Sequence, residues 1–224
     1  MSKQVKEKSE KIGFVKFWSW QLRSASMGAM VIILGYLSIY CTDTLGVPAA
    51  MVGTLLLASK VFDGVTDILA GFIIDNTNTK LGKARPYELA IFGVWGCTWL
   101  LFSASTEWSM AAKCAWIFSM YMLVNSIFAT FMYSNQQPYM IRAFKDQNQI
   151  IKVNAFGGII ISVICGGIAI VFPRLMATMA TSTEGWSRLV GMFALPLLVI
   201  GILRFIFVKE EYEVEDSDDD KVTF

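Results

Sequence analysis

The chain has 224 residues, of which 55% are hydrophobic and 17% are charged, and its formal net charge is +1. An ordinary soluble domain has roughly 25% charged residues, so this composition is typical of a protein that crosses a membrane several times. The small net charge gives no sign of a nucleic-acid partner. The four cysteines are far apart and form no C-x-x-C pair, which predicts neither a metal site nor a disulfide framework.

The N-terminal residues 1–12 are polar and basic, and we expect them to form a cytoplasmic arm without a cleaved signal peptide. The first apolar run extends from about residue 13 to residue 41 and contains Arg23 near its start. Trp18 and Trp20 fit a belt of aromatic residues at the level of the lipid headgroups. We therefore expect the first transmembrane helix to act as an uncleaved anchor.

The second apolar run, residues 48–75, is long enough to span a bilayer but carries Lys60, Asp63 and Asp67. Each charge at that depth costs about 2.5–3.5 kcal/mol on insertion scales. The spacings i,i+3 and i,i+4 place all three residues on one helix face. If all are ionised, the face has one excess negative charge, which one monovalent cation or one proton would neutralise. A structural alternative is a helix–helix ion pair in which Lys60 bridges Asp63.

Four further apolar runs follow, at residues 87–105, 111–138, 153–176 and 186–208. We therefore predict six transmembrane helices. Lys and Arg are concentrated in alternate loops, so the positive-inside rule places both termini in the cytoplasm. Pro138 is expected to end or bend the fourth helix, and Pro196 to kink the sixth. Residues 209–224 are acidic and are expected to form a solvated cytoplasmic linker.

The second helix and the loop after it contain the pattern D-x3-D-x3-G-x3-D-x-T-x4-G-K-x-R-P. It is filled by Asp63, Asp67, Gly71, Asp75, Thr77, Gly82, Lys83, Arg85 and Pro86. This pattern resembles the helix 2 and loop 2–3 signature of the glycoside–pentoside–hexuronide:cation symporters, the melibiose-permease-like branch of the major facilitator superfamily. Many members have proline directly after the second aspartate, where this chain has Ile68.

The resemblance covers essentially the whole chain. It implies an all-α protein of the cell membrane, in which residues 13–208 form the N-terminal six-helix bundle of a major facilitator fold, built from two three-helix repeats. The family fold has two such bundles with the substrate between them, so we expect a second bundle as partner, either a missing C-terminal half or a second copy. A truncated chain is the preferred explanation of the length.

The function that the resemblance implies is cation-coupled symport of a glycoside, pentoside or hexuronide by alternating access, with no enzymatic activity. No cofactor is expected beyond a coupling ion, which is Na⁺, Li⁺ or H⁺. We predict that Asp63 and Asp67 bind this ion and that Lys60 adjusts their charge. Thr66 and oxygen atoms of the fourth helix would complete the shell, because a small hard cation prefers several oxygen ligands.

The fourth helix ends in a segment that resembles the family's N-x-P-Y motif, with Gln136, Pro138 and Tyr139 at the matching positions. We predict that the substrate is contacted by polar residues of the first and fourth helices, namely Arg23, Asn125, Asn135, Gln136 and Tyr139. Melibiose-type members have an acid at the position of Gln136 and another near the level of Met27. Both are absent here, which implies a different substrate or a different mode of recognition. Alternatively, Arg23 extends to the headgroups and the other polar residues cap the helix.

The loop after the second helix resembles the superfamily's cytoplasmic gate, where charges pair across helix ends as the two bundles rock. The gate residues predicted from it are Asp75, Thr77, Gly82, Lys83, Arg85 and Pro86. Two other functions stay open: a half-length module that binds or regulates a partner, and a carrier of lipid or another solute. An intramembrane aspartyl protease is disfavoured, because Asp63 and Asp67 share one helix and no G-x-G-D follows.

Overall fold

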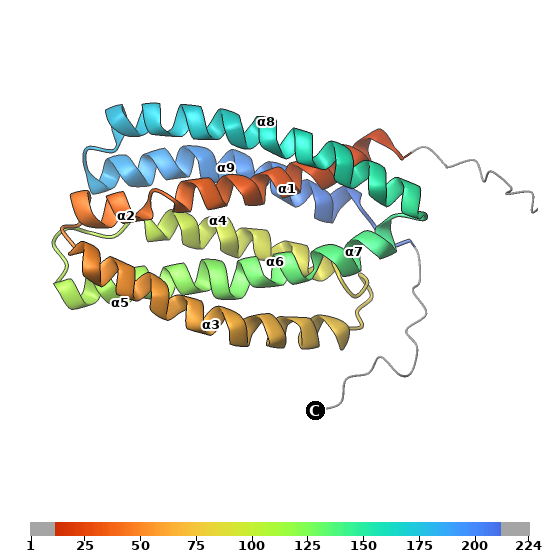
Figure 1. The fold of residues 1–224 in the computed structure, drawn as a ribbon, viewed down its shortest axis with the longest axis horizontal. Coiled ribbons are helices and arrows are strands. Elements are labelled where there is room, and N and C mark those ends of the chain that lie inside the picture. The colour runs from red at the N-terminus through yellow and green to blue at the C-terminus, as the bar shows by residue number, and fades with distance from the viewer. Residues whose placement is uncertain (1–11, 212–224) are drawn as a thin grey trace, which may run out of the picture.

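The computed structural model describes residues 12–211, which form six long helical segments side by side. Figure 1 shows that the described chain begins and ends at the same end of the bundle, so consecutive segments run in opposite directions. The first segment consists of α1 (Phe14–Leu34), α2 (Leu37–Ile39) and the π-helical η1 (Tyr40–Thr44). The second segment is α3 (Ala49–Asp75), and the third consists of the 3₁₀ turn η2 (Arg85–Leu89) followed by α4 (Ala90–Leu101). The six predicted helices are confirmed.

The fourth segment is built from four pieces: α5 (Met110–Met122), the π-helical η3 (Leu123–Ala129), α6 (Thr130–Ser134) and α7 (Gln136–Ala143). The fifth and sixth segments are α8 (Gln147–Met179) and α9 (Thr183–Phe207). Of the two alternatives predicted for Pro138, that it ends or bends the fourth helix, the first is wrong, and the segment is interrupted at Asn135, between α6 and α7. Pro138 lies in the first turn of α7, where a proline costs no intrahelical hydrogen bond, so the helix continues beyond it.

Three of the helices begin at a side chain that accepts a hydrogen bond from a free backbone N–H of the first turn. Ser109 caps α5, Asp146 caps α8 and Ser182 caps α9. Such caps satisfy donors that have no partner within the helix. The caps of α8 and α9 make these helices start earlier than the apolar runs alone predict, because hydropathy does not detect polar first turns.

Four of the six segments are long and apolar enough to span a membrane, namely Phe14–Thr44, Met110–Ala143, Gln147–Met179 and Thr183–Phe207. The 27-residue α3 is long enough as well, but it carries the charged residues Lys60, Asp63 and Asp67. The third segment is divided between η2 and α4. The architecture is therefore that of an all-α membrane bundle.

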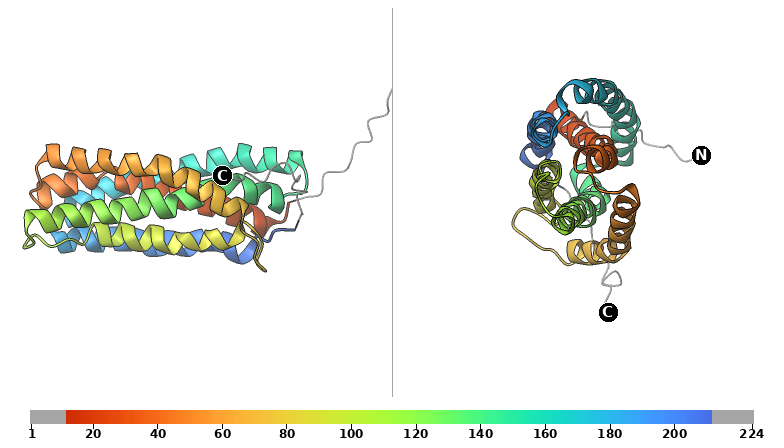
Figure 2. Two further views of the ribbon diagram at one scale, coloured as in Figure 1. Left: turned by 90° about the horizontal axis from the view of Figure 1, so that it is seen from below. Right: turned by 90° about the vertical axis from the view of Figure 1, so that its left-hand side faces the viewer.

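Within the bundle α1 packs mainly against α8 and α9, and α4 packs against α9 and η3. In the end-on view of Figure 2, α1 lies near the middle, while α8 and α3 lie at opposite sides of the bundle, as they do in Figure 1. Both outer helices expose apolar side chains, such as Leu57 and Val61 on α3 and Ile159 and Val163 on α8. These two sides have no partner among the described residues.

Close packing between α1, α4 and α9 depends on small and polar residues. The buried Ser26 hydroxyl donates to the carbonyl of Leu197 and accepts from the indole N–H of Trp95. A side chain at Gly201 would come within 3.0 Å of both Ile91 and Ser26, so glycine is required for the helices to approach this closely. Every polar atom in this contact is satisfied, which fixes the three helices as a unit.

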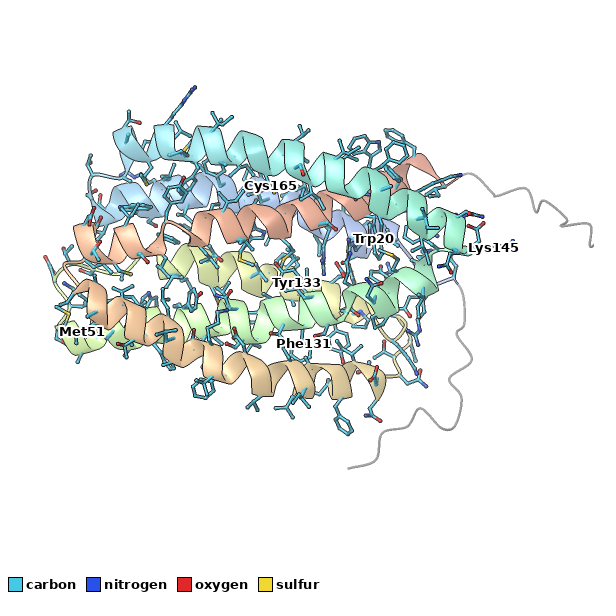
Figure 3. All side chains as sticks on the ribbon, in the orientation of Figure 1. Trp20, Met51, Phe131, Tyr133, Lys145 and Cys165 are labelled. Carbon is cyan, nitrogen blue, oxygen red and sulfur yellow. The ribbon has the colours of Figure 1, made fainter. Side chains whose placement is uncertain are left out.

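A smaller apolar cluster lies at the end of the bundle where the described chain begins and ends. It surrounds Trp20, whose ring packs against Tyr139 and Phe144. Trp20 is 1% exposed, so the prediction that it belongs to a headgroup belt is wrong. In Figure 3, Trp20 and Lys145 lie toward this end and Met51 lies at the other.

Candidate functional site

The charged face of α3 has the geometry expected from its spacing. The Lys60 Nζ atom donates to Asp63 Oδ2 at 2.6 Å. The Lys60 side chain is 55% exposed and that of Asp63 is 21% exposed. Asp67 follows one turn later and is exposed. The predicted ion pair between Lys60 and Asp63 is thus present, and both carboxylates face the fourth segment.

The opposite wall is the π-helical η3, which sequence analysis did not predict. The Ser126 hydroxyl makes a very short hydrogen bond to Asp63 Oδ1, and Thr130 Oγ1 donates to Asp67 Oδ1 at 3.0 Å. A π turn is common at functional sites, because its wider backbone turn shifts the side chains that follow it. Here the shift is visible at Thr130, whose hydroxyl also reaches the carbonyl of Asn125, five residues earlier.

Two carboxylates and two hydroxyls therefore meet between α3 and the fourth segment. These are hard oxygen donors, which suit a small hard cation better than a soft one. The described residues contain no group of three or more His, Cys, Asp or Glu side chains that could hold a metal ion. Two carboxylates and two hydroxyls are oxygen donors that suit a monovalent cation or a proton.

The remaining predicted ligand of this site is Thr66, which lies between Asp63 and Asp67 on α3. The Thr66 hydroxyl has one proton and donates it to the carbonyl of Phe62 or of Asp63 on its own helix, so both of its lone pairs stay available to an ion. Asn125, which is predicted to contact the substrate, bonds within its own helix, through its amide to the carbonyl of Tyr121 at 3.2 Å. The prediction that oxygens of the fourth helix complete the shell now has candidates in Ser126 and Thr130.

A second polar cluster lies inside the bundle, closer to the end that holds the described termini. Arg23 on α1 pairs with Glu88 through two nitrogen atoms, at 3.0 and 3.3 Å. Arg204 on α9 lies 3.6 Å from the same carboxylate. All three side chains are almost fully buried. Two guanidinium groups thus share one carboxylate, which leaves one positive charge in excess in the interior.

The excess charge is spread over neutral acceptors. Gln136 Oε1 accepts from Arg23 at 3.0 Å and from Arg204 at 2.7 Å. Arg204 also donates to the carbonyl of Trp20 and to Ser24, and its guanidinium lies 3.7 Å from the centre of the Trp20 ring. Such contacts offset part of the desolvation cost of a buried charge. The cluster joins α1, η2, the fourth segment and α9.

The contacts of Arg23 exclude one of the two positions predicted for its side chain. The arginine does not extend to the headgroups, because Glu88 and Gln136 hold it inside the bundle. Asn135 donates to Glu88 at 3.4 Å and Tyr139 donates to the carbonyl of Val208 at 2.7 Å. The structure brings these predicted substrate residues into one buried cluster, apart from Asn125. Their contact with a substrate stays a prediction.

Glu88 and Arg204 were missed by sequence analysis, although they complete this cluster. Two buried polar atoms in it have no hydrogen-bond partner, Asn135 Oδ1 and Arg204 Nε. The sequence gives only a weak signal that these two residues are buried, because Glu88 lies at the start of an apolar run and Arg204 at the end of another. Charges at such positions are usually assigned to the headgroup region.

The loop after α3 surrounds an acidic side chain from the far end of the described chain. The Glu210 carboxylate accepts hydrogen bonds from the backbone N–H groups of Lys83, Ala84 and Arg85, at 3.1, 2.8 and 2.7 Å. Gly82 has φ +111, and a side chain there would come within 2.4 Å of the carboxylate. Glycine is therefore required at this position both by its backbone conformation and by the space.

The remaining gate residues form contacts within this loop and with neighbouring helices. Arg85 donates to the carbonyl of Phe205 at 2.9 Å and lies over its ring. The Thr77 hydroxyl makes a hydrogen bond with the Tyr87 hydroxyl, and Pro86 is the second residue of η2. Asp75 is exposed and forms no ion pair within residues 12–211. Residues 1–11 and 212–224, which include most of the predicted arm and tail, lie outside the described residues.

An open groove of about 590 Å³ lies on the fourth segment near the end opposite to the termini. It is lined by Trp108, Ser109, Ala112, Ala115, Trp116, Ser119 and Met120. The rings of Trp108 and Trp116 meet edge to face at 5.3 Å. None of the predicted cation or substrate residues lines this groove, so it is separate from both polar clusters.

The chain is similar to known sugar transport proteins. The family model described as MFS/sugar transport protein matches residues 23–223. The glucuronide carrier protein homolog of Escherichia coli (strain K12) is 39% identical over 103 residues, which cover 43% of this chain and 20% of that protein. The isoprimeverose transporter of Lactiplantibacillus pentosus is 27% identical over 191 residues, covering 81% of this chain and 39% of that protein.

A third relative is the inner membrane symporter YicJ of Escherichia coli (strain K12), which is 30% identical over 98 residues, covering 43% of this chain and 21% of that protein. The chain thus spans less than half the length of these relatives. The family match nevertheless includes all six helical segments except the first turns of α1. The resemblance based on the loop motif is therefore confirmed, and the chain belongs to the MFS/sugar transport protein family, whose members are transporters and not enzymes.

Proposed function

We propose that the chain is the N-terminal six-helix half of a cation-coupled symporter for a sugar or sugar derivative, located in the cell membrane. The observation that carries the proposal is the group of oxygen atoms where Asp63 and Asp67 face Ser126 and Thr130. Acidic residues within a transmembrane segment usually mark an ion or proton pathway. The coupling ion is Na⁺, Li⁺ or H⁺, and each would neutralise the single negative charge of the α3 face.

Binding of this ion would draw α3 toward the fourth segment, since the ligands come from both. Transporters of this kind rock one bundle against another around a central site. The proposal therefore includes a second six-helix bundle, and the exposed apolar sides of α3 and α8 support it. The names of the glucuronide carrier homolog and the isoprimeverose transporter favour a glycoside, pentoside or hexuronide as the substrate.

For the substrate, we propose that Asn125 and Gln136 make direct contacts, because both are half-buried. Arg23, Asn135 and Tyr139 are buried and would act behind them, by holding Gln136 and the fourth segment in place. The excess positive charge of the buried arginine cluster would in this way offset the negative charge of an acidic sugar, without direct contact between the sugar and both arginines.

The experiment that tests the function is equilibrium cation binding to the purified chain in lipid nanodiscs, titrated with Na⁺ and Li⁺ at several pH values. We expect saturable binding that Asp63→Asn abolishes and Asp67→Asn weakens at least tenfold, because each removes a charged ligand. Glu184→Gln, which removes an 83% exposed carboxylate, is the matched control and should bind as the parent does. The cation site is refuted if both aspartate variants bind cations with the affinity of the parent.

A further inference from the structure

Lys60 is placed where the coupling cation would have to bind. Its Nζ atom lies 2.6 Å from Asp63 Oδ2, while the other oxygen of the same carboxylate accepts from Ser126. Asp67 accepts from Thr130. Within the described residues Lys60 forms no other ion pair. A cation that uses both oxygens of Asp63 therefore meets the positively charged Lys60 ammonium at one of them, and the two cations compete for that oxygen.

The Lys60 ammonium resembles the expected cation in charge and in its preference for oxygen atoms. It differs in being tethered to the same helix, one turn before Asp63. A tethered group competes at an effective concentration in the millimolar range or above, without being consumed. Because the Lys60 side chain is 55% exposed within the described residues, no packed side chain of this bundle has to move when the ammonium leaves Asp63.

We infer that Lys60 is a built-in competitor of the coupling cation, which occupies Asp63 in the empty site and is displaced when the ion binds. This inference rests on the proposed cation site and adds a residue that sets its affinity. The displaced Lys60 ammonium stays near the charged face of α3. After the exchange the coupling cation is bound at Asp63 and the ammonium lies beside it. A competitor of this kind lowers the affinity for the ion and speeds its release, which a transporter needs at the end of each cycle.

The first test compares Na⁺ affinity in the parent chain, Lys60→Gln and Lys60→Arg, each in nanodiscs with choline replacing Na⁺ to hold ionic strength constant. We expect Lys60→Gln to bind Na⁺ about two- to fivefold more tightly, the range given by a partly exposed ion pair. Lys60→Arg should bind more weakly than the parent, because a guanidinium holds a carboxylate with two nitrogen atoms. Lys80→Gln makes the same charge change at an exposed loop residue and should match the parent.

The second test distinguishes displacement of the Lys60 ammonium from Asp63 from a purely electrostatic effect of its charge on Na⁺ binding. Amine acylation is followed by mass spectrometry as Na⁺ is added to the parent chain. Displacement predicts that Lys60 reacts faster as Na⁺ binds, with a midpoint at the Na⁺ dissociation constant, while the rate at Lys80 is unchanged. If saturating Na⁺ binds but leaves Lys60 reactivity unchanged, the inference is overturned and the cation site stands. If neither Na⁺, Li⁺ nor protons bind at Asp63, the proposed function falls, and the inference with it.

Discussion

Thr130 shows how one residue connects the site to the backbone around it. Its hydroxyl can donate to Asp67 or to the carbonyl of Asn125, and it has only one proton for the two acceptors. When a cation approaches Asp67, the proton can turn to Asn125 and leave the oxygen free to bind the ion. The Thr66 hydroxyl bonds only to its own helix.

We therefore predict that Thr130→Val lowers the cation affinity about tenfold, because it removes an oxygen ligand of the bound ion, a contact comparable in strength to a hydrogen bond to a charged group. Thr66→Val should have the smaller effect, because Thr66 has no hydrogen bond to either carboxylate. Both affinities can be measured by titration of the chain in nanodiscs. A larger loss for Thr66→Val would instead support the shell that the sequence predicts.

Among residues 12–211, Glu88 is the only carboxylate that pairs with Arg23 and Arg204. Removing it leaves two buried guanidinium groups without an anionic partner. We predict that Glu88→Gln lowers the free energy of unfolding by about 3–5 kcal/mol, as for other broken buried ion pairs. Thermal unfolding of the chain in detergent measures this, with Glu107→Gln in an exposed loop as the control. A variant as stable as the control would mean that the cluster is not structurally important.

The two polar clusters differ in how far they could be predicted. Lys60 and Asp63 are three residues apart on one helix, so helix geometry alone predicts their contact. Arg204 and Gln136 are 68 residues apart in the chain, and their contact depends on how α9 packs against the fourth segment. No periodicity within either helix contains that information, which is why Glu88 and Arg204 were missed.

At the scale of elements, the loop after α3 is held by the chain segment that leaves α9. Three backbone N–H groups bind the Glu210 carboxylate, and the side chain of Arg142 lies 4.0 Å from it. This site lies where the loop after α3, the last turn of α7 and the segment after α9 meet at one end of the bundle. The sequence predicts Glu210 to be a solvated linker residue, but its side chain is only 9% exposed.

We predict that Glu210→Gln weakens this contact, because a neutral amide has one acceptor oxygen in place of two charged ones. Hydrogen exchange of the backbone N–H groups of residues 83–85 should become about tenfold faster. Glu211→Gln removes the neighbouring carboxylate, which pairs with Lys16 instead, and serves as the control. Unchanged exchange in Glu210→Gln would show that the loop does not depend on the carboxylate.

The helices themselves follow from the apolar runs, because a membrane-spanning segment needs about 20 apolar residues. The π turns η1 and η3 do not follow from them. Neither η1 (YCTDT) nor η3 (LVNSIFA) has a sequence pattern that distinguishes a π turn from an α turn, and η3 packs against both α3 and α4.

At the scale of the whole molecule, alternating segments place the loop after α3 and the loop before α5 at opposite ends of the bundle (Figure 1). We predict that the first loop is cytoplasmic. In a cysteine-free background, an impermeant thiol reagent added to intact cells should label a cysteine at Thr106 and not one at Lys80. The reverse pattern would contradict the orientation inferred from the positive-inside rule.

The exposed apolar sides of α3 and α8 lead to a further prediction for the whole chain. One bundle supplies one wall of a central cavity, and alternating access requires a second. Residues 1–224 expressed alone should therefore give no substrate accumulation above that of empty cells. Uptake assays over a panel of glycosides, pentosides and hexuronides measure this. Robust accumulation without a second half, and without a cross-linked dimer, would show that one bundle is sufficient.

The π turn η3 also affects how relatives of this chain should be aligned. A π turn is equivalent to an α turn with one extra residue, and each residue of an α-helix rotates the chain by about 100°. A relative that lacks one residue between Ser126 and Thr130 would form an α turn there, and the side chains on both sides of the gap would keep their directions toward Asp63 and Asp67. A one-residue gap placed within η3 therefore keeps the partners of both aspartates aligned, and closing it by shifting the alignment would pair side chains that point in different directions.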